Sequence, residues 1–473
     1  MSEFIANVAA GVWTPVLFLL ILGGLFFFIY SRLLHYKYFT HSVAILRGKY
    51  HDPKDPGQIS PYEALSTALA STVGMGNIAG VAAAISLGGP GALFWMWVTA
   101  FVGMSTNFFT STLSVMYRGK DSEGEIQGGP MYVIREALGK NWKPLSVLFC
   151  ICAMIGCLPI FQANQLTSVI IGIAVDSEET RNMSFNLMGF EINTLKFIIG
   201  TILMLISGVV ILGGIQRIGT WAGKMVPLMI VLYFASVLGI LIMNIDQVPH
   251  YLGLIFAEAF NPTYYNTQCN SMTAGVFGGL VMLGVRRASF SNEAGIGTAP
   301  MALGASQSKE PIREGLVSMM SPAIDTLVVC TLTGFAILVT GAWQDPVINC
   351  SPQGATLTAQ AFNSAFPGFG KYVLLLCAFF FAITSLFSYS YYGNKALSFL
   401  IGVKPAKYYD YFYLATIIVG AVASMTDVMN VIDIAYALMA FPTMLSGFAL
   451  APKVMAEAKA YFKRLDAERA SGQ

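Results

Sequence analysis

The chain has 473 residues, of which 55% are hydrophobic and only 11% are charged, and its 27 Lys and Arg residues against 25 Asp and Glu residues give a net charge of +2. Soluble domains carry about 25% charged residues, so this composition excludes an ordinary soluble protein. It predicts an all-α polytopic membrane protein that lies in a lipid bilayer. The small net charge gives no indication of nucleic acid as a partner.

Uncharged segments that approach or exceed the roughly 20 residues needed to cross a bilayer recur along the chain. They lie at 4–31, 64–117, 144–175, 197–216, 225–245, 372–394 and 434–452. The segment 64–117 is long enough for two helices and contains the turn-forming sequence GGPG at 88–91. Three further segments carry a charge or a polar break but are otherwise apolar, near 272–300, 316–340 and 410–426. The pattern predicts 11 spans.

The basic residues predict the orientation, because Lys and Arg concentrate in cytoplasmic loops. With an odd number of spans the two termini lie on opposite sides. If the C-terminus is cytoplasmic, 22 of the 27 basic residues are cytoplasmic too. The exceptions are Arg181, Lys196 and Lys371 outside, and Arg286 and Arg287 in the membrane region. We therefore expect an extracytoplasmic N-terminus and a cytoplasmic C-terminus in the plasma (inner) membrane.

The sequence contains no recognisable enzyme signature. A Walker A motif, an HExxH zinc motif and a nucleophile elbow are all absent from it, so we expect no catalytic residue and no bound cofactor. Five of the seven cysteines fall within predicted spans, where a thiol behaves as a small hydrophobic group. Cys269 and Cys350 fall in predicted outside loops, and a disulfide between them stays open.

The stretch STVGMGNIAG, residues 71–80, interrupts the second predicted span with glycines and polar residues. A glycine inside a helix costs about 1 kcal/mol relative to alanine. An unwound segment at membrane depth persists only where it is buried in protein or lines a cavity. The alternative is close helix packing through small residues. The stretch is thus a candidate binding segment.

A second interruption follows MTAGVFGGLVMLGV, an apolar stretch of only 14 residues that leads into RRASFSNEAGIGTAP. Arg286 and Arg287 at mid-membrane would cost roughly 2.5–3.5 kcal/mol each without partners. Glu293 and Asp325 are the expected counter-charges. We expect the arginines to anchor the span rather than to contact a substrate.

The two interruptions divide the chain into halves. After an extra N-terminal helix and cytoplasmic linker (1–60), five spans lie in 61–245 and five in 272–452, with an extracytoplasmic loop at 246–271 and a cytoplasmic tail at 453–473. Each half begins with its interrupted helix and has an odd number of spans, so the halves enter the membrane from opposite sides. This pattern is typical of inverted-repeat transporters. Exposed N–H groups at a half-helix N-terminus attract a carboxylate, and exposed carbonyls at the facing C-terminus coordinate a cation, which suits an amino acid with Na⁺.

Several motifs resemble the alanine or glycine:cation symporter family, the sodium:alanine symporters. They are ALASTVGMGNIAGVAAAISLGGPGALFWMWV, EIQGGPMY, FSNEAGIGTAP, EPIREGLVSMMSPAIDTLVVCTLTG, FPGFGKY, SYYG and ALMAFP, in this order from about residue 60 to 450. The resemblance implies a leucine-transporter-type fold of inverted five-helix repeats, here with one extra N-terminal transmembrane helix.

The resemblance also implies a substrate site. In the family the first broken helix meets the substrate carboxylate, which implicates Thr72, Val73 and Gly74, with Gly76 supplying backbone freedom. The third core helix contributes a glutamine toward the amino acid, and the sequence FQAN places Gln162 there with Asn164 beside it. An interhelical hydrogen bond is the structural alternative for Gln162.

The sodium site common to this fold uses carbonyls of the first core helix and paired hydroxyls of the eighth. The match gives the carbonyls of Ala70 and Val73 and the side chains of Thr384 and Ser385. Oxygen ligands are what a hard cation requires. Asn77 either holds a second cation or ties down the break, and the tie is favoured.

One motif departs from the family pattern. Many members have Gly-Trp-Ser-Tyr-Tyr-Gly on the eighth core helix, whereas this chain has SYSYYG at 388–393. Tyr389 therefore brings a hydroxyl to a wall of the pocket that is large and apolar elsewhere. The preference among alanine, glycine and serine stays open.

The sequence thus predicts sodium-coupled symport of a small neutral amino acid, alanine with glycine or serine as further candidates, by alternating access. Proton coupling is the closest alternative, and a passive channel or a sensor on the same fold is less favoured. Na⁺ is expected as the coupling ion. Nothing in the sequence indicates an obligate protein partner, so we expect a monomer.

Overall fold

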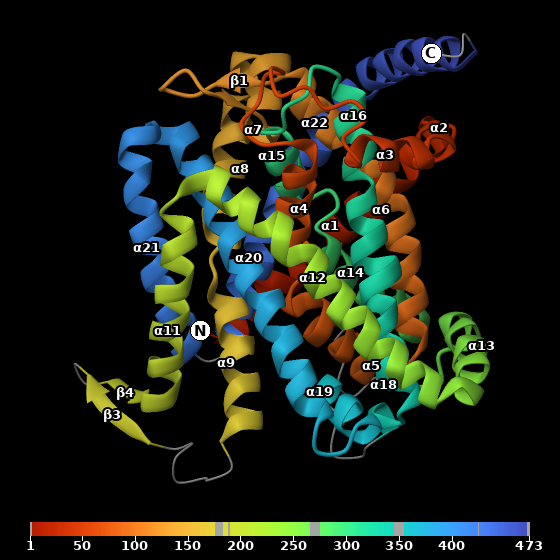
Figure 1. Ribbon diagram of the computed structural model, residues 1–473, viewed down its shortest axis with the longest axis vertical. Helices are drawn as coiled ribbons and strands as arrows, with labels where there is room; N and C mark the ends of the chain where they lie inside the picture. Colours follow the sequence, from red (N-terminus) through yellow and green to blue (C-terminus); the bar gives the residue numbers. More distant parts are fainter. Residues whose placement is uncertain are drawn as a thin grey trace.

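The computed structural model describes residues 2–175, 183–187, 190–264, 275–344, 354–423 and 425–470. Within these residues the chain is a bundle of long helices with two short antiparallel hairpins, β1–β2 and β3–β4, at its ends (Figure 1). The five cysteines that fall in predicted spans are free and buried. Cys269 and Cys350 lie outside the described residues.

The first half of the chain supplies these elements in order: α1 (Ser2–Tyr30), α2 (Leu34–Lys37), α3 (Phe39–Leu46), α4 (Pro61–Thr72), a π-helical segment (Gly76–Gly80), α5 (Val81–Gly88), α6 (Gly91–Met116), β1 (Gly119–Lys120), β2 (Ile126–Gln127), α7 (Pro130–Val133), α8 (Lys143–Gly156), α9 (Ile160–Ala174), β3 (Ser184–Leu187), β4 (Phe190–Asn193), α11 (Thr194–Ile211) and α12 (Gly214–Met243).

The second half supplies α13 (Val248–Phe260), α14 (Gly275–Asn292), α15 (Thr298–Leu303), α16 (Pro311–Ser318), α17 (Met320–Pro322), a second π-helical segment (Ala323–Cys330), α18 (Thr331–Val339), α19 (Gly354–Ala365), α20 (Gly370–Ile401), α21 (Val403–Val422) and α22 (Met425–Ala470). The predicted tail from residue 453 is therefore a continuation of α22. Figure 1 shows it leaving the bundle at the C-terminal end.

The polytopic membrane architecture is confirmed. In the described part of the chain, 8 helices are long and apolar enough to cross a membrane, and 9 if the bent pair formed by α4 and the helix after it counts as one span. Two segments that the prediction of 11 spans includes, α14 and α21, are not among them. Each carries a polar, charged stretch, RRASFSN in α14 and KPAKYYD in α21. The full count stays a prediction.

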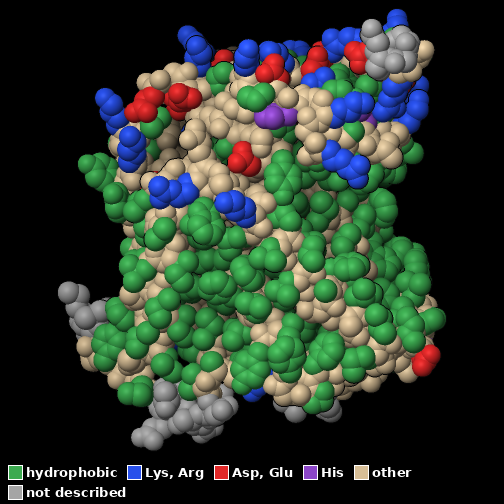
Figure 2. Space-filling model, viewed as in Figure 1, with side chains coloured by type: hydrophobic (Ala, Val, Ile, Leu, Met, Phe, Trp, Pro, Cys, Tyr) green, Lys and Arg blue, Asp and Glu red, His purple; other side chains and the backbone are tan. Residues whose placement is uncertain are grey.

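The surface is divided as a bilayer requires. Figure 2 shows a broad hydrophobic belt around the middle of the molecule and most Lys and Arg side chains gathered at one end. The C-terminus lies at that same end (Figure 1). Large apolar side chains on the outer helices are open to the surroundings, such as Val209 and Val231 at 66% exposure each. In a bilayer these side chains would contact lipid tails.

The start of α4 is fixed by local chemistry. The Ser60 hydroxyl accepts a hydrogen bond from the Glu63 backbone N–H at 3.2 Å, and the Glu63 carboxylate accepts one from the Ser60 N–H at 3.0 Å. This is a capping box, with Pro61 at the first helical position. The helix that carries the first interruption therefore begins at a defined residue.

A short backbone pairing joins the beginning of α4 to the end of α15. The Gln58 N–H donates to the Ala305 carbonyl at 2.7 Å, and the Gln307 N–H donates to the Ile59 carbonyl at 2.7 Å. Arg118, which follows α6, secures this junction. Its guanidinium donates to the carbonyls of four residues, Pro56 (3.0 Å), Gly304 (2.9 Å), Ser308 (2.8 Å) and Ser306. α4 and α15, one half of each interrupted helix, are thereby held together.

This junction predicts an effect of Arg118→Gln. Loss of the guanidinium leaves several partly buried carbonyls without donors, so the free energy of unfolding should fall by about 2–4 kcal/mol. Thermal unfolding of the purified protein in detergent measures the change. Arg464→Gln is the matched control, because Arg464 is 57% exposed and makes one surface ion pair with Glu310, worth less than about 1 kcal/mol. Equal shifts in the two variants would contradict a special role for Arg118.

Candidate functional site

Both predicted interruptions are present, and the structure places the second one. α4 ends at Thr72, and the helix resumes through the π-helical turn Gly76–Gly80 with a bend of 47°. α14 ends at Asn292 and α15 begins at Thr298. Between them the backbone has positive φ at Glu293 (54°), Gly295 (86°) and Gly297 (113°). Positive φ is costly for a residue with a Cβ, so Glu293 is held in place by its surroundings.

A buried carboxylate ties the two interruptions together. Asp325, in the π-helical segment Ala323–Cys330, accepts a hydrogen bond from the Asn77 side-chain amide at 2.6 Å. It also accepts bonds from the hydroxyls of Ser291 and Thr326, both at 2.8 Å. Asn77 belongs to the first break and Ser291 to the last turn of α14 before the second. Asp325, Asn77 and Ser291 are all at most 1% exposed.

The hydrogen bonds of the Asn77 side chain stabilise the first break. Its side-chain oxygen accepts the Gly74 N–H at 2.9 Å, while its amide nitrogen donates to Asp325. It thus satisfies a backbone group freed by the break and links that break to the rest of the bundle. The sequence had left open a second-cation role for this residue.

The prediction that Glu293 and Asp325 are the counter-charges of the two arginines of α14 is wrong. Arg286 forms an ion pair with Asp433 on α22 and lies over the Trp13 ring of α1 at 5.5 Å. The described part of the chain contains no ion pair that involves Arg287, Glu293 or Asp325. The error has a physical reason: the chain leaves the helix after Asn292, so helical spacing no longer relates Arg286 to Glu293.

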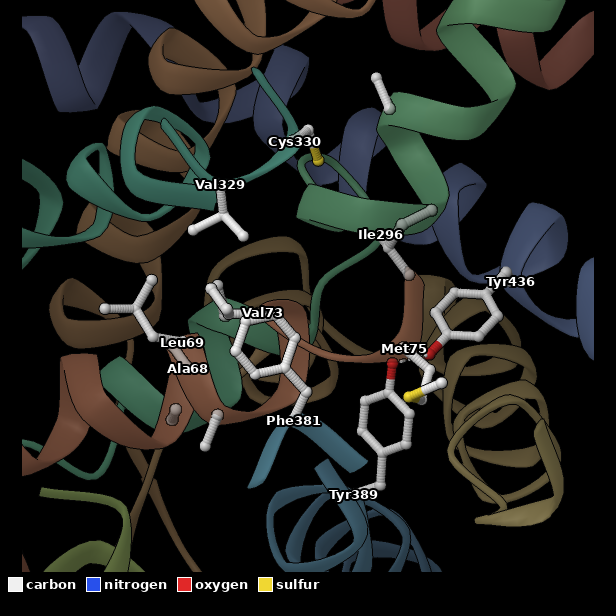
Figure 3. Packing of buried hydrophobic residues seen from close by; sticks show 14 of the residues in the cluster. Ala68, Leu69, Val73, Met75, Ile296, Val329, Cys330, Phe381, Tyr389 and Tyr436 are labelled. Atoms are coloured by element: carbon white, nitrogen blue, oxygen red, sulfur yellow. Dashed lines mark hydrogen bonds between the residues drawn. The ribbon is translucent and has the colours of Figure 1, made fainter. Parts of the chain in front are cut away.

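Glu293 instead meets a cluster of hydroxyls. Tyr389 of α20 and Thr298 of α15 donate to its two carboxylate oxygens. The Tyr436 hydroxyl of α22 lies 3.2 Å from the oxygen that Tyr389 also contacts, and 2.8 Å from the Tyr389 hydroxyl. Figure 3 shows Tyr389 and Tyr436 converging beside Met75, which belongs to the first break. Sequence reasoning missed Glu293 as a site residue, although an acid inside a glycine-rich break was a signal.

Thr384 and Ser385, the two predicted hydroxyl ligands of sodium, are adjacent on α20, but their hydroxyls have different partners. The Ser385 hydroxyl donates to the Phe381 carbonyl at 3.0 Å and lies 3.4 Å from the Ser71 carbonyl at the end of α4. The Thr384 hydroxyl donates to the Phe380 carbonyl at 2.9 Å and faces the Met229 sulfur of α12 at 3.5 Å. Ser385 therefore meets the first break directly, and Ser71 is an oxygen that the sequence did not single out.

Ala70 and Val73, the predicted carbonyl ligands, are both buried near the end of α4. The last carbonyls of a helix have no partner within it. The end of α4 therefore presents carbonyl oxygens close to the Ser385 hydroxyl. The Thr72 hydroxyl is turned back to the Ala68 carbonyl of its own helix at 3.2 Å.

Gln162 and Asn164, two polar residues of the sequence FQAN, have different surroundings. Gln162 is 4% exposed, and its side-chain oxygen has no hydrogen-bond partner among the described residues. Asn164 points elsewhere: its amide donates to the carbonyls of Gly420 at 3.1 Å and Ala423 at 2.8 Å, at the end of α21. Asn164 therefore stabilises helix packing and is not directed at the breaks.

The two glycines of the first break have different surroundings. A Cβ on Gly74 would lie 2.5 Å from the Ser385 hydroxyl oxygen, too close for any side chain. A Cβ on Gly76 would lie 3.7 Å from its nearest neighbour, the Ser291 Cα, which is an ordinary contact. Gly76 also lacks a positive φ, so the backbone freedom expected of it is not used here.

Gly74→Ala is therefore expected to destabilise the protein by about 1–3 kcal/mol through overpacking, whereas Gly76→Ala should change stability little. Thermal unfolding in detergent measures both. The double variant Gly74→Ala, Ser385→Ala should recover much of the loss, because the next contact of the new Cβ is at 3.6 Å. Equal effects of the two glycine variants would argue against the close approach of α20 to the break.

Comparisons with known proteins place the chain in a family. The sequence profile of the sodium:alanine symporter family matches residues 1–472. The chain is 36% identical over 462 residues to the sodium/alanine symporter AgcS of Methanococcus maripaludis, covering 97% of each protein. It is 32% identical to the probable sodium/glutamine symporter GlnT of Bacillus subtilis, over 98% of this chain and 92% of that protein.

The fold has a counterpart among solved structures. The crystal structure of MhsT in complex with L-phenylalanine superposes with a TM-score of 0.55 at 13% identity, covering 86% of this chain and 99% of that one. The likeness concerns the fold alone, and it supports the leucine-transporter-type arrangement expected from the sequence. The profile match over nearly all residues and the similarity to AgcS show that the chain belongs to the sodium:alanine symporter family. Members of this family are sodium-coupled amino-acid transporters and not enzymes.

Proposed function

We propose that this protein couples the entry of Na⁺ to the uptake of a small neutral amino acid by alternating access. The observation that carries the proposal is the meeting of α20 with the first break, where the Ser385 hydroxyl lies against the end of α4. Exposed carbonyls and a hydroxyl form an oxygen-rich site for a cation. Backbone N–H groups at this first break would bind the carboxylate of the amino acid.

The proposed sodium ligands are the carbonyls of Ala70 and Val73 and the hydroxyls of Thr384 and Ser385, with the Ser71 carbonyl as a further oxygen. The proposed substrate-binding residues are Thr72, Val73, Gly74 and Gly76 through the backbone, together with the side chains of Gln162 and Tyr389. The unpartnered oxygen of Gln162 supports this choice, since a buried polar atom without a partner favours a ligand.

We propose alanine as the substrate, with glycine and serine as further candidates. Hydrophobic side chains lie around the two breaks, among them Val73, Met75, Ile296 and Tyr389 (Figure 3), and such surroundings suit an uncharged substrate side chain. The relatives carry names with different amino acids, alanine for AgcS and glutamine for GlnT. Direct competition among amino acids is therefore part of the test.

The proposed topology has 11 spans with the repeats 61–245 and 272–452, in the plasma (inner) membrane, as a monomer. Two packings support the repeats. α11 packs against α21, the fourth helices of the two halves, and α9 packs against α20, the third helices. The basic end of the molecule supports a cytoplasmic C-terminus and an extracytoplasmic N-terminus (Figure 2).

Proton coupling is the second candidate, and a specific observation favours it. Glu293 and Asp325 are fully buried beside the breaks, and no ion pair in the described residues includes either of them. A carboxyl group in the membrane without a basic partner is a proton site in many transporters. The coupling ion must therefore be tested and not assumed.

Uptake of labelled L-alanine into proteoliposomes tests the proposal. One Na⁺ entering with a zwitterion gains about 2.3 kcal/mol per 100 mV, and a tenfold Na⁺ gradient adds about 1.4 kcal/mol. Together they would sustain an accumulation of about 500-fold at a stoichiometry of one to one. Replacing Na⁺ by K⁺ should abolish it, and unlabelled alanine, glycine and serine should compete.

The variant Thr384→Ala, Ser385→Ala should raise the Na⁺ concentration for half-maximal uptake by at least about tenfold, because two charge-bound oxygens are lost. Ser398→Ala is the control, since it removes a hydroxyl in the last turn of the same helix, away from Thr384 and Ser385. Accumulation that follows a pH gradient without Na⁺ would favour proton coupling. Equilibration without accumulation under every gradient would exclude a symporter and indicate a channel.

A further inference from the structure

Glu293 is an isolated acid at the centre of the molecule. It lies inside the second break, is 1% exposed, and is one of the few non-glycine residues with positive φ. Such backbone positions persist where the surroundings enforce them, and they cluster at ligand sites. The family match does not assign a role to this residue.

Among the residues that the structure describes, the hydrogen-bond partners of the Glu293 carboxylate are the neutral hydroxyls of Thr298, Tyr389 and Tyr436. Of the two arginines on α14, Arg286 pairs with Asp433, and no ion pair in the described part of the chain includes Arg287 or Glu293. An ionised carboxylate at membrane depth is costly without a cation. A transported cation would supply the missing charge.

The positions of the breaks indicate which cation this is. Gly76 of the first break and Ser291, two residues before Glu293, are so close that a Cβ on Gly76 would lie 3.7 Å from the Ser291 Cα. An amino acid whose carboxylate meets the N–H groups of the first break therefore has its ammonium group facing the second. Asp325 has a different role, because its carboxylate joins the two breaks by accepting hydrogen bonds from the Asn77 amide and the Ser291 hydroxyl.

We propose that the Glu293 carboxylate binds the ammonium group of the transported amino acid, with Tyr389 and Tyr436 as positioning residues. The assignment rests on the proposed function, since it requires an amino acid at the breaks. It restricts the substrate class to compounds with a free, protonated α-amino group. A 2-hydroxy acid of the same size, such as L-lactate, lacks the cation that Glu293 would bind.

Binding of L-alanine and of L-lactate to the purified protein in Na⁺ tests the proposal, with wild type compared to Glu293→Gln. The glutamine keeps the size and an acceptor oxygen but removes the charge. Alanine affinity should fall by about 10- to 100-fold, the range for a charge-assisted hydrogen bond, while the weak lactate affinity stays within about threefold. Binding of ²²Na⁺ in the absence of amino acid should also be retained. An unchanged ratio of alanine to lactate affinity would overturn the proposal.

Two further variants separate binding from folding. Glu293→Asp keeps the charge and should restore part of the preference for alanine over lactate. Tyr436→Phe removes one hydroxyl of the cluster but no charge, so it should weaken both ligands together and leave the ratio within about threefold. A ratio lost in Tyr436→Phe but kept in Glu293→Gln would assign the cluster a structural role and overturn the proposal.

The wild type alone provides an independent measurement. The infrared difference spectrum on binding carboxyl-¹³C-labelled L-alanine should show a shift of an ionised protein carboxylate. The appearance or loss of a protonated carboxyl band, with proton release or uptake on binding, would overturn the proposal in favour of a proton site. Failure of wild type to bind any amino acid would instead contradict the proposed function, and is distinguished from these outcomes by the wild-type data alone.

Discussion

The hydrogen bonds of Asp325 are the interaction on which the rest of the site depends. A helix broken at membrane depth leaves backbone groups that water cannot satisfy. Asp325 links the two breaks, because its carboxylate accepts hydrogen bonds from the Asn77 side-chain amide on one side and from the Ser291 hydroxyl on the other. The Asn77 side-chain oxygen in turn accepts a hydrogen bond from the Gly74 N–H. The two interruptions are therefore parts of one hydrogen-bonded unit.

This unit explains the irregular helices around it. Asn77 and Asp325 both lie in π-helical segments, Gly76–Gly80 and Ala323–Cys330. A π-helical turn widens the helix by a residue, and such turns are frequent at functional sites. Close approach of the α20 helix then requires a glycine at position 74, because Ser385 occupies the space of a side chain. The irregular backbone, the small residues and the buried acid are thus consequences of one arrangement.

Local patterns were enough to predict most of the long apolar helices and both breaks, because apolar runs and clustered glycines are visible along the chain. They were not enough to pair residues that are distant in sequence. The partner of Arg286 is Asp433, on another helix, and Asn164 is held by carbonyls of Gly420 and Ala423. Glu293 was recognised as an acid but given the wrong partner, since its neighbours Tyr389 and Tyr436 come from two other helices. Only the packed structure brings these groups together.

The contacts on either side of the breaks define how the molecule is closed. Two contacts reach α22, one from Glu293 in the second break to Tyr436 and one from Arg286 of α14 to Asp433. Toward the C-terminal end, the pairing of Ile59 with Ser306 and the guanidinium of Arg118 join α4 to α15. The alternating access proposed above requires one of these two sets to separate while the other holds. In that proposal the hydrogen bonds of Asp325 to Asn77 and Ser291 keep the two breaks together in both states.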